Sequence, residues 1–337
     1  MSGHELPVLA PLVDGFARRV SYLRLSLTDR CNYRCTYCMP EAGVPLLPRP
    51  EVLSIEEIVR LVALLREVGV RRVRITGGEP TVRHGLVDLV GRLAALGLDD
   101  LALSTNAHTL AELAAPFRGA GLRRLNVSLD SLDPARFRQI TRWGDVARVK
   151  AGLEAAREAG FTGTKVNAVA LAGWNDHELV AIARWCWERE LTPRFIEWMP
   201  MSDGVLYAPG SFMAAAAIRA RLARELGPFV GDDGGDLPGV GPARYLRFAG
   251  GRVGVISPVS EPFCDTCNRI RLAADGQLHA CLADDGTLDL KPLLRRGDSD
   301  EALVAALRRG LRAKVLGHDF KATGCGGPRK HMVAIGG

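Results

Sequence analysis

The chain has 337 residues, of which 47% are apolar and 24% are charged, and its basic residues outnumber its acidic ones by 44 to 38. This composition indicates a soluble globular protein, and its length suits an α/β barrel with an extension. No run approaches the ~20 apolar residues of a membrane span, and the first twenty residues lack the apolar core of a secretory signal, so we expect a cytoplasmic protein without a membrane partner.

Short apolar runs alternate with amphipathic segments from residue 22 to about residue 197. We expect strands at 22–27, 72–76, 101–104, 125–129, 164–170 and 194–197, and helices at 54–68, 86–96, 110–117, 146–159 and 177–190. The first helix opens with a capping box, Ser54 at the N-cap and Glu57 three residues later, and ends at Gly69. Six β/α units in series predict a parallel sheet, and six are fewer than the eight that close a full barrel.

The pattern changes after Pro200. We expect a loop at 202–213, a helix at 214–226, a mobile glycine- and aspartate-rich stretch at 227–242, strands at 244–248, 253–256 and 270–273, and a last helix near 300–314. The predicted organisation is a tail at 1–20, a partial-barrel core at 21–200 and a covering domain at 201–337.

Three cysteines follow the first expected strand with the spacing C-x3-C-x2-C: Cys31, Cys35 and Cys38. Thiolates are the soft ligands that iron–sulfur clusters need, and this spacing in a long chain indicates metal ligation in a reducing compartment. Three ligands leave one iron of a four-iron cluster free to hold an exogenous molecule. A ferredoxin would supply a fourth cysteine, and a structural zinc site would also need a fourth ligand. No further cysteine follows until Cys186, so we expect an open cluster.

A second set of cysteines lies far along the chain, with the spacing C-x2-C-x13-C: Cys264, Cys267 and Cys281. These three again suggest a cluster with one uncommitted iron. The competing interpretation is zinc with His279 as fourth ligand, because His279 shares a strand face with Cys281. Spacing alone leaves both open. The remaining cysteines are expected to be a core thiol at Cys186 and an exposed thiol at Cys325.

Three of the expected strands are followed or ended by short polar segments, one of four residues with two glycines and two of three residues. They are Gly77-Gly78-Glu79-Pro80, Ser104-Thr105-Asn106 and Ser128-Leu129-Asp130. Glycines at a strand end let a ligand approach the backbone, although a tight turn would use them too. The two polar triplets lie where barrel enzymes bind ligands, or they cap the helices that follow.

Cations occur within four expected strands: Arg24, Arg74, Lys165 and Arg194. Buried cations are costly unless an anion meets them. Each could pair with Glu197 or Asp130, or could point toward the helix layer. With Arg269 and Arg271 facing them, they suggest instead a polyanion such as a triphosphate.

The first cysteine set, with Tyr37 directly before its third cysteine, resembles the signature of the radical S-adenosylmethionine superfamily. That resemblance implies a partial (β/α)6 barrel as the core. It also implies that the open iron chelates the methionine moiety of S-adenosylmethionine. An electron from the cluster then cleaves the sulfonium to give a 5′-deoxyadenosyl radical.

Both cysteine sets, the arginine pair and the final Gly336-Gly337 together resemble the GTP 3′,8-cyclase family of molybdenum-cofactor biosynthesis over residues 20–337. The resemblance implies a lyase that abstracts the ribose 3′ hydrogen of GTP. The C3′ radical then attacks C8 of guanine, and reduction gives 3′,8-cyclo-7,8-dihydro-GTP. Two departures from the family are Arg72, where lysine is frequent, and Ala107, where glycine is usual.

The same resemblance implies a role for each matching residue. It assigns the first [4Fe–4S] cluster to Cys31, Cys35 and Cys38, and the second [4Fe–4S] cluster to Cys264, Cys267 and Cys281. It assigns S-adenosylmethionine contacts to Tyr37, Gly78, Ser128 and Met199. It assigns GTP contacts to Arg24, Arg74, Thr105, Lys165, Arg269 and Arg271. It assigns catalytic roles to Arg269, Arg271, Gly336 and Gly337.

Further partners are expected to be an electron donor and the next enzyme of the pathway, with the protein a monomer or homodimer. Two alternatives stay open. One is a radical enzyme with an auxiliary cluster that modifies a peptide. The other is a non-enzymatic iron–sulfur or zinc protein that binds RNA.

The C-terminal tail ends in two glycines, which have no side chains and so fit a crowded pocket. Met332 and Ile335 can anchor the segment. We therefore expect the di-glycine end to enter the active site.

Overall fold

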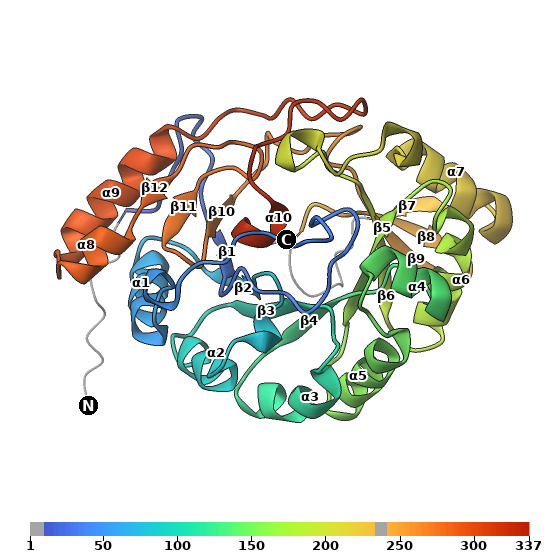
Figure 1. Cartoon of the computed structure of the whole chain (residues 1–337), viewed down its shortest axis with the longest axis horizontal. Helices are drawn as coiled ribbons and strands as arrows, with labels where there is room; N and C mark the ends of the chain where they lie inside the picture. Colours follow the sequence, from blue (N-terminus) through green and yellow to red (C-terminus); the bar gives the residue numbers. More distant parts are fainter. Residues whose placement is uncertain (1–9, 233–240, 337) are drawn as a thin grey trace.

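The computed structural model describes residues 10–232 and 241–336. Six parallel strands form the centre of the fold: β1 (Tyr22–Ser26), β2 (Arg72–Thr76), β3 (Asp100–Thr105), β4 (Arg124–Ser128), β5 (Lys165–Ala170) and β6 (Thr192–Glu197). They neighbour one another in chain order and curve into an arc with helices on its outer side (Figure 1). The predicted series of six β/α units, an incomplete barrel, is therefore confirmed.

The helices of this series cover the outer side of the arc (Figure 1). They are α1 (Ile55–Glu67), α2 (Leu86–Ala94), α3 (Leu110–Gly119), α4 (Pro134–Thr141), α5 (Val146–Glu158) and α6 (Leu179–Trp187). The predicted capping box is present, since Ser54 Oγ accepts from the Glu57 amide and Glu57 accepts from the Ser54 amide. The short helix α4 was not predicted. It begins at the N-cap Asp133 with proline at its first position, and it buries few apolar side chains.

The C-terminal third extends the same sheet at both edges. Its strands are β7 (Val230–Asp232), β8 (Arg244–Phe248), β9 (Gly251–Ile256), β10 (Arg269–Leu272), β11 (Gln277–His279) and β12 (Leu288–Asp289). Strand β10 pairs in parallel with β1, and β9 pairs in parallel with β6, so the described strands follow the order β12-β11-β10-β1-β2-β3-β4-β5-β6-β9-β8-β7. The expected boundary between a core at 21–200 and a covering domain at 201–337 therefore falls within one continuous sheet. This division into domains stays a prediction.

Four helices complete the described chain: α7 (Ala215–Leu226), α8 (Lys291–Arg295), α9 (Asp300–Arg312) and α10 (Met332–Ile335). The predicted helices at 214–226 and 300–314 correspond to α7 and α9, whereas the short α8 and α10 were not predicted. The expected mobile stretch at 227–242 contains β7, and its residues 233–240 lie outside the described part of the chain. Within the described ranges, no helix has both the length and the apolar character that crossing a bilayer requires.

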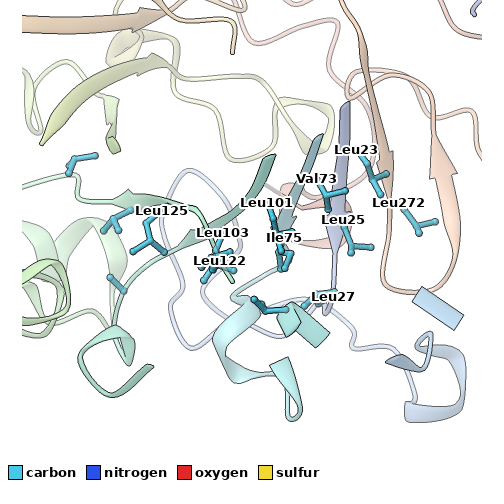
Figure 2. Close-up of a cluster of buried hydrophobic side chains, with 14 of the residues drawn as sticks. Leu23, Leu25, Leu27, Val73, Ile75, Leu101, Leu103, Leu122, Leu125 and Leu272 are labelled. Carbon is cyan, nitrogen blue, oxygen red and sulfur yellow. The ribbon is translucent and has the colours of Figure 1, made fainter. Parts of the chain in front are cut away.

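Alternation along the strands separates an apolar layer from a charged interior. Leu23 is in register with Val73 on one side and Ile270 on the other, and all three are buried. Figure 2 shows this layer continuing through Ile75, Leu103 and their neighbours, packed toward the helices. Because successive side chains on a strand point to opposite faces, the residues between these apolar positions face the interior of the arc.

Candidate functional site

A cavity of about 340 Å³ lies at the carboxyl ends of the central strands. Its wall contains both cysteine sets: Cys31, Cys35 and Cys38 from the loop after β1, and Cys264, Cys267 and Cys281 from the C-terminal third. Active sites of barrel enzymes occupy this end of the strands. The fold thus brings the two distant motifs to one cavity.

The first cysteine set lies on a loop that is fixed by backbone hydrogen bonds. The amide of Cys38 donates to the Cys35 carbonyl at 3.0 Å, and the amide of Thr36 donates to the carbonyl of Ile140 at the end of α4 at 2.9 Å. Burial, followed by the charges of neighbouring groups, raises the pKa of Cys31 to about 11 and that of Cys38 to about 12. Three clustered thiolates therefore need a positive partner, and the irons of a cluster supply one.

The second cysteine set has cations beside it. Burial opposes ionisation of Cys267, but the charges of Arg269 and Lys314, together with hydrogen bonds from Arg269, lower the pKa of this thiol. Lys314 Nζ lies 3.5 Å from Cys267 Sγ and donates to the Arg269 carbonyl at 2.8 Å. His279 Nδ1, the fourth ligand of the zinc interpretation, lies 2.7 Å from Lys330 Nζ. Burial, followed by the charge of Lys330, lowers the pKa of His279 to about 3.

The glycine quartet after β2 packs against the segment that leads into the first cysteine loop. The Gly78 amide donates to the Thr28 carbonyl at 2.6 Å, and the Glu79 amide donates to the Arg30 carbonyl at 2.8 Å. A Cβ on Gly78 would collide with that Arg30 carbonyl. The sequence is compatible with glycines that admit a ligand or form a tight turn. In this structure Gly78 lines the cavity, but the close approach that requires glycine is made by the protein backbone.

The polar triplets after β3 and β4 line the cavity. The carboxylate of Glu79, 1% exposed, accepts hydrogen bonds from the Thr105 hydroxyl and the Asn106 amide, both at 2.7 Å. The N-caps of α3 and α4 are Thr109 and Asp133, so the capping interpretation of both triplets is wrong. Thr105, a predicted GTP contact, is thus held by Glu79 in the cavity wall.

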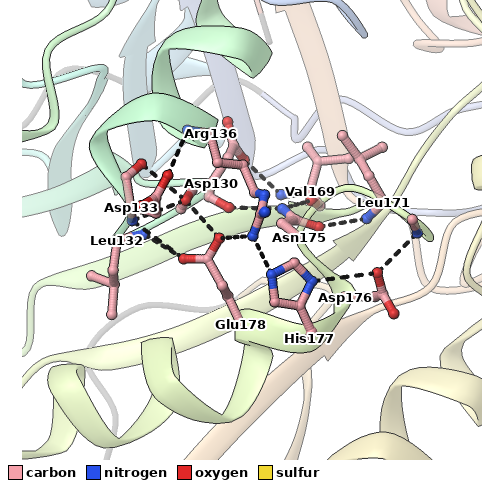
Figure 3. Close-up of polar contacts among 12 residues, drawn as sticks. Asp130, Leu132, Asp133, Arg136, Val169, Leu171, Asn175, Asp176, His177 and Glu178 are labelled. Atoms are coloured by element: carbon pink, nitrogen blue, oxygen red, sulfur yellow. Dashed lines mark hydrogen bonds and ion pairs between the residues drawn. The ribbon is translucent and has the colours of Figure 1, made fainter.

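Asp130 is the last residue of the triplet after β4, and it is buried in the cavity wall. Its two oxygens accept hydrogen bonds from the Tyr37 hydroxyl at 2.7 Å and from the Val169 amide at 2.9 Å. Figure 3 shows Asp130 within a network of polar side chains at the ends of β4 and β5. Burial raises the pKa of Asp130 to about 6, and the two hydrogen bonds oppose that rise.

In the described part of the chain, five arginines line the cavity: Arg24, Arg74, Arg194, Arg269 and Arg271. Arg24 is in register with Arg271 on β10 and with Arg74 on β2, so the three form one row across neighbouring strands. Burial, followed by neighbouring arginines, lowers the pKa of Arg271 and of Arg194 to about 10. A cluster of this kind favours binding of an anion.

The carboxylates considered as partners for these cations are engaged elsewhere. Glu197 is fully buried and accepts hydrogen bonds from the backbone amides of Ala215 and Val259 at 2.6 and 2.8 Å. It therefore joins β6 to the start of α7. Arg194 donates to the side-chain oxygens of Asn126 and Asn167 at 2.6 and 2.9 Å.

Lys165 differs from the other predicted GTP contacts. It is 2% exposed at the start of β5, and within the described residues it is not part of the cavity wall. Burial, followed by the charge of Arg194, lowers the pKa of Lys165 to about 7. It therefore lies among the interior cations but below the cavity surface.

The C-terminal tail reaches the arginine row. The Arg271 guanidinium donates to the Gly336 carbonyl, and a Cβ on Gly336 would collide with the Thr76 hydroxyl. Ile335 is buried and packs with the apolar cluster that includes Met332, as expected from the sequence. Figure 1 shows α10 inside the arc of strands. Gly337 lies outside the described residues.

The chain matches two family descriptions. Residues 25–186 match the Radical SAM superfamily, and residues 191–320 match Molybdenum Cofactor Synthesis C. Proteins named GTP 3′,8-cyclase are similar over nearly the whole chain. The protein of Pseudomonas putida strain F1 is 48% identical, covering 93% of this chain and 94% of that protein. The protein of Heliobacterium modesticaldum strain Ice1 is 45% identical, covering 97% and 100%. The chain belongs to the GTP 3′,8-cyclase family.

A solved structure supports the fold of this family member. Streptococcus suis SuiB bound to precursor peptide SuiA is similar with a TM-score of 0.50, at 17% identity, covering 60% of this chain and 44% of that chain. Identity at this level shows the fold alone. It gives no support to the alternative of a peptide-modifying enzyme.

Aromatic residues around the second cysteine set were not predicted as part of the cyclase-family site. The Arg269 guanidinium lies 4.9 Å from the centre of the Phe263 ring, and the rings of His318 and Phe320 are 4.3 Å apart. Phe263, His318 and Phe320 all line the cavity. They come from irregular segments without a periodic pattern, so they could not be predicted as site residues from the sequence.

Proposed function

We propose that this chain uses S-adenosylmethionine to cyclise GTP to 3′,8-cyclo-7,8-dihydro-GTP, the first step of molybdenum cofactor biosynthesis, in the cavity that both cysteine sets line. The single observation that carries the proposal is the shared cavity, in which two three-cysteine sets meet a row of arginines. Neither alternative function, peptide modification or RNA binding, explains why those arginines face the interior.

We assign the first [4Fe–4S] cluster to Cys31, Cys35 and Cys38, and S-adenosylmethionine contacts to Tyr37, Gly78, Ser128 and Met199, all of which line the cavity. When bound, this cluster supplies the electron that cleaves S-adenosylmethionine. The protein's own contribution is to hold the three thiols on one loop and to place Gly78 just after β2 and Ser128 at the end of β4.

We assign a second [4Fe–4S] cluster to Cys264, Cys267 and Cys281. The lowered pKa of Cys267 supports ligation by a thiolate. His279, the fourth ligand of the zinc interpretation, lies with its Nδ1 2.7 Å from Lys330 Nζ. This contact favours a cluster held by the three thiolates over a zinc site that includes His279.

We assign the triphosphate of GTP to the interior cations, with contacts from Arg24, Arg74, Thr105, Arg269 and Arg271, all of which line the cavity. Lys165, the remaining expected GTP contact, lies below the cavity surface, so we propose that it acts through its charge rather than by direct contact. Arg194 is added to this set, because it lines the cavity and hydrogen-bonds only neutral side chains in the contacts described above. Guanidinium groups bind phosphate oxygens through paired, charge-assisted hydrogen bonds. Holding the phosphates at one end orients the ribose C3′ toward the first cysteine set, and orientation of this kind lowers the barrier to reaction.

The reaction also needs an electron donor, and its product passes to the next enzyme of the pathway. We propose a cytoplasmic protein that works as a monomer or homodimer.

Substitution of Cys281 by serine tests the proposed function. The wild-type protein, reconstituted without oxygen, should convert GTP to the cyclised product, identified by mass. The variant should still form 5′-deoxyadenosine but should lose cyclisation, because the second set would keep only two thiolates. Metal analysis should show about four irons fewer than in the wild-type protein. One stoichiometric zinc in the wild-type protein at this site would support the zinc interpretation instead.

Replacing both Arg269 and Arg271 with alanine should weaken GTP binding while leaving both clusters in place. A charge-assisted contact contributes roughly 1.5–3 kcal/mol, so losing two should reduce affinity about 10²- to 10⁴-fold. Equilibrium binding measures the loss, and guanosine without phosphates serves as the comparison ligand.

Alanine at both Arg308 and Arg309, on the exposed face of α9, is the matched control and should bind GTP normally. If GTP and guanosine lost affinity equally in the site variant, Arg269 and Arg271 would not be phosphate ligands.

A further inference from the structure

A buried side-chain hydrogen bond joins the third-cysteine end of the first cysteine loop to the rim of the barrel. Tyr37 directly precedes Cys38, and its hydroxyl donates to Asp130 Oδ2 at 2.7 Å across 93 residues of sequence. Asp130 is 2% exposed. Tyr37 therefore has a fixed partner on the fourth β/α unit, immediately beside the third cysteine.

Asp130 is itself held from two further directions. Its other oxygen, Oδ1, accepts from the Val169 amide at 2.9 Å, and its carbonyl accepts from Asn175 Nδ2 at 2.7 Å. Asn175 is fully buried and also donates to the Val169 carbonyl at 2.9 Å. Figure 3 shows these contacts joining the ends of β4 and β5 to the turn before α6. Asp130 thus has little freedom to move.

The rest of the loop is attached to the same β/α unit through its backbone. The amides of Arg34 and Thr36 donate to the carbonyls of Thr141 and Ile140 at the end of α4, at 3.0 and 2.9 Å. The Tyr37 hydroxyl adds a side-chain contact at the point nearest the third cysteine. The fourth β/α unit therefore contacts the cysteine loop through both backbone and side-chain hydrogen bonds.

A buried carboxylate close to the thiols of Cys35 and Cys38 is electrostatically unfavourable, so its hydrogen bonds decide whether it is tolerated. Phenylalanine at position 37 would present the same ring but leave Asp130 Oδ2 without this donor. An apolar residue at position 130 would avoid the cost altogether. The presence of both groups indicates that the contact itself has a role.

We propose that Asp130 is a positioning residue that acts through the Tyr37 hydroxyl to fix the Cys38 end of the loop in the orientation that binds S-adenosylmethionine. This inference rests on the proposed function. It separates Asp130 from Ser128, which we place in direct contact with the cofactor.

The first test is a double-substitution cycle read by S-adenosylmethionine binding to the reconstituted protein. Tyr37→Phe should weaken binding about tenfold, since one hydrogen bond to a carboxylate is lost. In an Asp130→Ala background the same Tyr37→Phe change should have no further effect. Asp130→Asn should restore most of the affinity, because the Tyr37 hydroxyl can accept a hydrogen bond from the amide. If the losses of affinity from Tyr37→Phe and Asp130→Ala instead multiplied in the double variant, the proposal would be overturned and Asp130 would be a direct ligand of S-adenosylmethionine.

The second test needs neither cluster nor cofactor. In the cluster-free protein, Tyr37→Phe should raise hydrogen exchange of the backbone amides at 36–39 about tenfold and leave 264–281 unchanged. Unchanged exchange at 36–39 would overturn the proposal even if Asp130→Ala failed to fold. Tyr207→Phe is the matched control, because its hydroxyl donates to the Ala322 carbonyl at 3.1 Å outside the cavity wall. If the wild-type protein did not bind S-adenosylmethionine, the proposed function would fail while the exchange result would still stand.

Discussion

Replacing Cys35 with alanine should abolish cleavage of S-adenosylmethionine and leave the second metal site intact. Cys35 lies in the cavity wall between Cys31 and Cys38, and the two remaining thiolates cannot hold a cluster as three do. The measurement is 5′-deoxyadenosine formed by the anaerobically reconstituted variant, together with its iron content. We expect no 5′-deoxyadenosine above background and a loss of about four irons.

Cys325→Ala is the matched control for that experiment, because Cys325 is exposed and lies outside the cavity wall. This variant should keep wild-type iron content and activity. Near-normal 5′-deoxyadenosine formation by Cys35→Ala would contradict the assignment of the first cysteine set.

Deleting Gly336 and Gly337 should leave folding and both clusters intact but abolish the cyclised product. The Gly336 carbonyl accepts a hydrogen bond from Arg271, one of the proposed phosphate ligands. Loss of this contact should disturb the arginine row, and misplacement near reacting groups can cost about 100-fold in rate. The product is measured by mass, and thermal unfolding and iron content report on folding and clusters.

A single substitution sharpens the tail experiment. Gly336 has φ +78°, and a Cβ there would meet Thr76, so Gly336→Ala should also lower cyclisation. Gly119→Ala is the control, since a Cβ at this position on α3 meets no atom within 4 Å. Cyclisation of GTP at the wild-type rate by the truncated protein would reduce the tail to an ordinary chain end.

Local patterns in the sequence predicted the six central strands and both cysteine sets, because each depends on residues close together in the chain. The sequence left open whether Arg24 and Arg74 face the interior or the helix layer, and in the structure both line the interior cavity. The pairing of β10 with β1 and of β9 with β6 could not be predicted. Those pairings join segments far apart in the sequence, and the residue pattern of a strand does not determine which other strand pairs with it.

Several site features depend on packing that a single sequence does not display. The collision that requires glycine at Gly78 is with the Arg30 backbone, and Glu197 binds backbone amides rather than a cation. Lys165 lies below the cavity surface, although its pattern matched that of the interior arginines. The hydrogen bond between Tyr37 and Asp130 could not be predicted either, because it joins residues 93 positions apart that only the fold brings together.

The most direct test of the central claim is to incubate the anaerobically reconstituted protein with S-adenosylmethionine and GTP that carries deuterium at ribose C3′. We predict that the deuterium appears in 5′-deoxyadenosine and is absent from that ribose position of the cyclised product. Unlabelled 5′-deoxyadenosine, with all deuterium retained in unreacted GTP, would contradict abstraction of the 3′ hydrogen in this cavity.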